Sequence, residues 1–152
     1  MYENDFSDEN RPEKVRIGPS KTLQILSLFA HKFLYPTLYP DFDVTEEQFE
    51  TLLNLMENSI TGELEKVEKE VNISSENMND DMKKQVEDQL DYLIEAGELF
   101  LESIEEMRIY LENRAQEPEG REHLLRGIDV ARKADKQLRK SLEIFEYLRE
   151  TN

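Results

Sequence analysis

Apolar residues recur along most of the chain at alternating steps of three and four, the spacing that places them on one stripe of an α-helix. The longest stripe extends from residue 86 to residue 111, and similar stripes occupy residues 49–71 and 124–145. In the last stripe one large apolar residue is missing, and Ala134 and Asp135 occupy the place where it would fall. No segment shows the pattern of a β-strand. The spacing therefore predicts an all-α protein.

Prolines and one capping motif set the expected ends of the helices. All five prolines fall between apolar stripes. Thr45 and Gln48 fit a capping box, in which each side chain binds the backbone N–H of the other residue. The predicted helices cover residues 20–35, 45–71, 118–150, and a long segment from residue 74 or 75 to residue 116. Residues 1–18 are predicted to form a flexible acidic tail, and residues 19–152 a single helical domain.

Short connections force consecutive helices to run antiparallel, which predicts an up-down helical bundle of three long amphipathic helices plus one short apolar N-terminal helix. With the turns placed near Ile73 and Glu117, the stripes can be aligned. The expected neighbours are Leu64 with Val86, Phe49 with Phe100, Met107 with Ile128, Gly97 with Leu138, and Leu90 with Phe145. Gly97 then marks a tight helix crossing.

In this alignment, the helix over residues 45–71 does not reach the tip of the last hairpin, which includes Leu111 and Leu124. Residues 20–35 are apolar on nearly all sides, so they are expected to cover this tip. They do so either within one chain or by exchange between two chains, which makes a homodimer through this helix and the hairpin tip a hypothesis.

The chain is strongly acidic, with 35 acidic and 19 basic residues and a net charge of −16. Nucleic acids and anionic membranes attract basic surfaces, so neither is an expected partner. The absence of cysteine excludes disulfides and thiolate metal sites. No apolar run approaches the roughly 20 residues of a membrane span, and the N-terminus does not resemble a secretory signal. We therefore expect a cytoplasmic protein.

A row of carboxylates is expected along the outer face of the longest helix. Each member lies two positions before a residue of the apolar stripe, which places it about 200° around the helix. The row consists of Asp91, Glu95, Glu98, Glu102 and Glu105. It is interpreted either as a solvated face or as a docking surface for a basic protein partner, whose binding would weaken with salt.

Aromatic residues gather around Pro36 and Pro40. The members considered for partner binding are Phe29, Phe33, Tyr35 and Tyr39. They are expected to pack the short helix onto the bundle, or alternatively to line a groove for a partner helix.

Candidate metal ligands are sparse. A di-iron bundle requires Glu three residues before each histidine, but Leu28 precedes His31 and Gly120 precedes His123. Glu46, Glu47 and Glu50 resemble the first acidic run of the all-α nucleotide pyrophosphohydrolases, but the second run of that family, Glu-x-x-Asp, is missing. No metal ligand, cofactor site or catalytic residue is assigned.

These observations favour a non-enzymatic protein–protein interaction module, such as an adaptor, a regulator or a chaperone-like binder. Two alternatives remain: a carboxylate- and Mg²⁺-dependent all-α hydrolase, and a self-assembling structural subunit.

Overall fold

The computed structural model describes residues 18–74, 79–113 and 119–151, and all regular structure in these segments is helical. In chain order the elements are α2 (Lys21–Leu34), the short 3-10 helix η2 (Pro36–Leu38), α3 (Glu46–Ser74), α4 (Asp80–Asn113) and α5 (Glu119–Thr151). The predicted all-α class is confirmed for these segments. None of the described helices is both long enough and apolar enough to cross a membrane. The predicted tail lies almost wholly outside the described residues.

The helices α2, α3 and α4 each follow a residue whose side chain accepts from a free backbone N–H group. The predicted capping box is present: Thr45 N donates to Gln48 Oε1 at 2.8 Å, and Gln48 N donates to Thr45 Oγ1 at 3.1 Å. The start expected at residue 74 or 75 was wrong, because Ser74 is the last residue of α3. Asn79 caps α4 instead, accepting from Met82 N at 2.8 Å.

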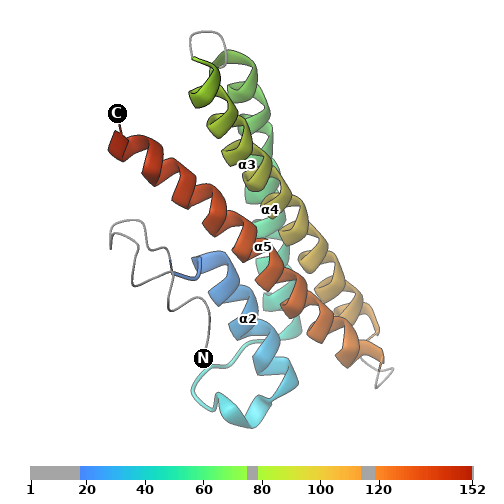
Figure 1. The fold of residues 1–152 in the computed structure, drawn as a ribbon. Helices are drawn as coiled ribbons and strands as arrows, with labels where there is room; N and C mark the ends of the chain where they lie inside the picture. Colours follow the sequence, from blue (N-terminus) through green and yellow to red (C-terminus); the bar gives the residue numbers. More distant parts are fainter. Residues whose placement is uncertain (1–17, 75–78, 114–118, 152) are drawn as a thin grey trace.

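Figure 1 shows α3 and α4 running in opposite directions, with α5 reversing direction again and crossing α4 at an angle. The short helix α2 lies against α5. Within this single chain, α2 covers the hairpin tip: Leu26 and Ala30 are fully buried in one cluster with Ile104, Met107 and Leu124. Of the two arrangements expected for the short helix, the structure therefore shows the one that needs no second chain.

The contacts between α4 and α5 agree with the expected register to within one helical turn. Ser103 Oγ donates to the carbonyl of Gly127 at 2.6 Å. A Cβ atom on Gly127 would lie 2.9 Å from Met107 Cγ, so Met107 packs beside the predicted neighbour Ile128. Both contacts tie the C-terminal half of α4 to the first half of α5.

The predicted register between α3 and α4 was wrong by about three helical turns. Leu64 lies against Gly97 rather than Val86, and Arg108 donates to Asn54 Oδ1 at 2.7 Å. An apolar stripe repeats after 7 or 11 residues, so sliding one helix by that length leaves apolar residues facing each other.

The C-terminal half of α5 moves away from α3 and α4, as Figure 1 shows for its red end. Leu138 is still packed against the core, but Phe145 is 47% exposed. The expected burial of Phe145 against Leu90 therefore does not occur. The apolar stripe of α5 continues past the point where its neighbours can cover it.

Candidate functional site

An apolar groove with a volume of about 240 Å³ opens where α5 separates from α3 and α4. Its floor includes Ile60 and Leu64 of α3, Leu93 and Phe100 of α4, and Leu138 of α5. All five residues belong to the apolar stripes of their helices, so the groove is the part of the bundle seam that the helices leave open. Exposed apolar concavities of this kind are typical of binding sites.

Three polar side chains line the groove: Thr22 of α2, and Ser59 and Glu63 of α3. Glu63 is the only ionisable residue among those that line it, and its carboxylate lies 3.6 Å from Lys66 Nζ on the solvent side. The groove is therefore suited to binding an apolar group.

Gly97 allows α3 to approach α4 at the floor of the groove. A Cβ atom at this position would lie 2.6 Å from Leu64 Cδ2 and 2.9 Å from Leu64 Cγ. The predicted tight crossing is present, but its partner is α3 rather than Leu138 of α5, although Leu138 also lines the groove. Glycine at this position therefore brings two walls of the groove together.

The carboxylate row lies on the face of α4 that points away from the groove. Asp91, Glu95, Glu98, Glu102 and Glu105 are all exposed. The helical repeat places them on the side of α4 opposite the groove-lining stripe. Glu95 accepts from Gln137, and Glu105 lies 3.6 Å from Arg108, while no described cation pairs with the other three.

Most of the aromatic set packs within the chain. The ring of Phe29 meets that of Phe42 edge-on at 5.2 Å, and the ring of Phe33 stacks on that of Phe49 at 5.2 Å. Tyr39 is half-buried, and its carbonyl accepts from Lys32 Nζ at 2.8 Å. These contacts give the packing role that one of the two interpretations predicts for Phe29 and Phe33.

Tyr35 is the one exposed member of that set, at 39%. The Arg121 guanidinium lies 5.1 Å from its ring centroid and also donates to the carbonyl of Leu34 at 3.0 Å. Arg121 thus holds the end of α2 on α5. Neither the aromatic set nor the carboxylate row shares a residue with the groove lining.

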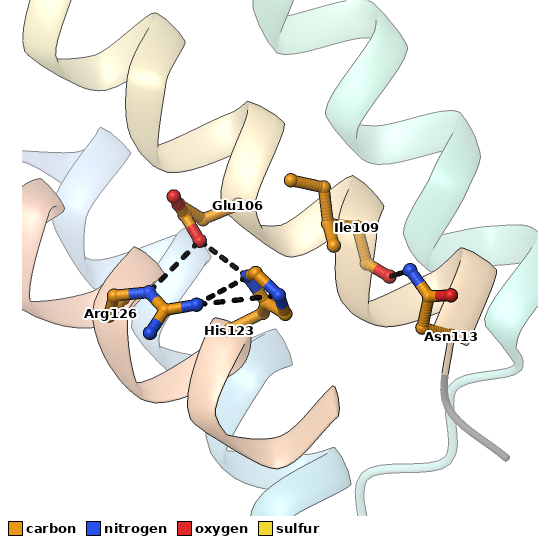
Figure 2. Close-up of polar contacts among 5 residues, drawn as sticks. All are labelled: Glu106, Ile109, Asn113, His123 and Arg126. Atoms are coloured by element: carbon orange, nitrogen blue, oxygen red, sulfur yellow. Dashed lines mark hydrogen bonds and ion pairs between the residues drawn. The ribbon is translucent and has the colours of Figure 1, made fainter. Parts of the chain in front are cut away.

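A polar cluster links α4 and α5 on another part of the surface (Figure 2). Glu106 Oε1 lies 2.7 Å from His123 Nδ1 and 3.3 Å from Arg126 Nε. The hydrogen bond from His123 is the main reason that the pKa of Glu106 is lowered, and Arg126 lowers it further against the opposing effect of burial. His123 is therefore a half-buried hydrogen-bond partner of Glu106. None of the three residues lines the groove.

In the described residues, no three His, Asp or Glu side chains are grouped closely enough to hold a metal ion. Glu46, Glu47 and Glu50, which resemble an acidic run of pyrophosphohydrolases, occupy the first turns of α3. Negative charge is favoured there by the helix dipole. The other histidine, His31, is half-buried in α2, and burial, followed by the charge of Arg132, lowers its pKa.

Most of the apolar residues that line the groove belong to the predicted stripes, where they were expected to lie in the closed core. Ile60, Leu64 and Leu138 all stood in the predicted stripes, and periodicity alone does not show where one helix leaves another. Phe145, at the open end of the α5 stripe, was likewise expected to be buried.

No protein-family model, curated protein sequence or solved structure matches the chain.

Proposed function

We propose that this chain is a non-enzymatic protein-interaction module and that its groove receives an apolar side chain from a protein partner. One observation carries the proposal: apolar side chains from three helices form an open groove whose lining holds a single ionisable residue. Burying such a surface against a partner removes it from water, which is the main driving force of protein association.

The dimensions of the groove support a side chain as its occupant. An apolar cavity of roughly 150 Å³ is large enough for a benzene ring, and the groove holds about 240 Å³. A phenylalanine, leucine or methionine side chain therefore fits without displacing the floor. Aromatic anchors seated in apolar pockets contribute much of the affinity of protein interfaces.

The carboxylate row supports a separate, electrostatic contribution to partner binding. Asp91, Glu98 and Glu102 are exposed and have no described cationic partner. Exposed charges of one sign steer an oppositely charged protein and act mainly on the association rate. Salt screens charges but not apolar contacts, so it should weaken the contribution of the row to partner binding and leave the contribution of the groove largely intact.

The test is affinity capture with the tagged protein from its native lysate, comparing the wild type with two variants of α3. Ser59→Phe places a phenyl ring at the groove, whereas Asn58→Phe adds the same ring at the neighbouring exposed position, which does not line the groove. Captured proteins, including untagged copies of the chain itself, are quantified at low and at high salt.

We expect Ser59→Phe to lose a partner that the wild type and Asn58→Phe both retain, including at high salt. Capture of the same proteins by all three forms would contradict the groove as the binding site. Loss of all partners at high salt would instead point to the carboxylate row.

A further inference from the structure

Phe145 is the exposed aromatic side chain that continues the groove along α5. It lies seven residues beyond Leu138 on the same helical stripe, with Leu142 between them. At 1.5 Å per residue, Phe145 stands about 10 Å from the groove residue Leu138 along the helix axis. Helix periodicity thus places the exposed side chain of Phe145, the knob, on the same face of α5 as the groove residue Leu138.

We propose that the occupant of the groove is Phe145 of a second copy of this chain, in a symmetric dimer. This inference rests on the function proposed above, because it names the partner of the same groove. A two-fold axis that passes between a knob and a groove on one surface places each knob in the groove of the other copy. Both apolar features of the surface are then buried by a single interface.

The charges around the knob and the groove favour the same pairing. Arg149 follows Phe145 by one helical turn, while Glu63 lines the groove. Arg149 pairs with Glu146 and Glu63 pairs with Lys66, in both cases within one helix. The side chains of Arg149 and Glu63 are themselves exposed, whereas that of Glu146 is 17% exposed, so Arg149 and Glu63 lie where they can face a second copy.

The interface pairs the helix of balanced charge, α5, with a groove in the most acidic part of the protein. Residues 118–152 carry 7 acidic and 8 basic side chains, whereas residues 41–117 carry 23 acidic and 6 basic ones. Two chains that each carry a net charge of −16 repel one another at long range. Placing α5 against the groove of α3 and α4 keeps two strongly acidic surfaces from facing each other, which limits this repulsion.

Sedimentation velocity over a range of concentrations tests this proposal on the full chain. We expect the wild type to dimerise, and Phe145→Ala to raise the dissociation constant at least about tenfold. Ser59→Phe should have the same effect, because it fills the groove that receives the knob. Leu55→Ala is the matched control, since Leu55 is 63% exposed on α3 and does not line the groove.

A wild type that stays monomeric up to roughly 100 μM, or a dimer that Phe145→Ala leaves unchanged, would overturn this proposal. The function proposed above would survive either result if lysate capture still depended on Ser59. Circular dichroism of each variant establishes that the helices remain folded, which is expected because Ser59, Leu55 and Phe145 are exposed.

Discussion

The backbone N–H of Ser20 donates to Oδ1 of Asp135 at 2.9 Å, so a fully buried carboxylate of α5 binds the first turn of α2. Oδ2 of Asp135 lies 2.9 Å from Arg139 Nε without making a hydrogen bond. Negative charge is favoured at the N-terminus of a helix. Together with Arg121 at the other end of α2, Asp135 fixes α2 along α5 and places Thr22 at the groove.

Replacing Asp135 should therefore loosen α2 first. We expect Asp135→Ala to lower the free energy of unfolding by about 2 kcal/mol, because it leaves the Ser20 N–H without its acceptor. Asp129→Ala is the control, since Asp129 is exposed and pairs only with Lys133 at 3.4 Å; it should change stability by less than about 0.5 kcal/mol. Urea denaturation measures both changes. Hydrogen exchange should show lost protection concentrated in α2, and uniform loss across α4 and α5 would argue against this role.

Two glycines within helices should respond oppositely to alanine. Gly62→Ala meets no atom within 4 Å, so it should stabilise the protein by up to about 1 kcal/mol through helix propensity. Gly97→Ala drives its Cβ into Leu64, and we expect a loss of about 1 kcal/mol from overpacking. Thermal denaturation of the two variants provides the comparison. Equal stabilisation by both would show that α3 does not depend on Gly97 for its close approach.

Charge reversal within the carboxylate row should stabilise α4. In Glu98→Lys the new lysine attracts Glu95 and Glu102, which Glu98 repels. The free energy of unfolding should therefore rise by about 0.5 kcal/mol. The gain should shrink in high salt, because exposed charges are screened. Chemical denaturation at two salt concentrations measures the effect. A gain that is independent of salt would have to come from something other than charge.

Acid should remove the contribution that Glu106 makes to the stability of the fold. Its pKa is lowered, so its ion pairs stabilise the fold above the ordinary value of 4.5, and this stabilisation is lost as the pH falls through the lowered pKa. We expect Glu106→Gln to be less stable than the wild type near neutral pH, by up to about 1 kcal/mol after solvent screening. The two should converge in acid. Glu98→Gln is the comparison: it removes like-charge repulsion from Glu95 and Glu102, so near neutral pH it should differ from the wild type in the opposite direction in urea denaturation.

The amino-acid sequence by itself determined which segments are helical and which side of each helix is apolar. The stripe from Val86 to Leu111, the capping box at Thr45 and the outward-facing carboxylate row follow from helix geometry, which acts over a few residues. For the same reason the all-α class was predictable. The interruption at Asp135 was visible too, but its cause was not, because Ser20 lies 115 residues away in the chain.

Only the tertiary structure decided how the helices slide and diverge. The stripe around Leu64 fits Val86 and Gly97 equally well, because shifting it by 11 residues leaves its apolar positions facing the partner helix. Whether Phe145 is buried likewise depends on the crossing angle of α5, which many small packing contacts set together. The groove exists because α5 departs from its neighbours before its apolar stripe ends, and no periodicity within one helix encodes where that departure begins.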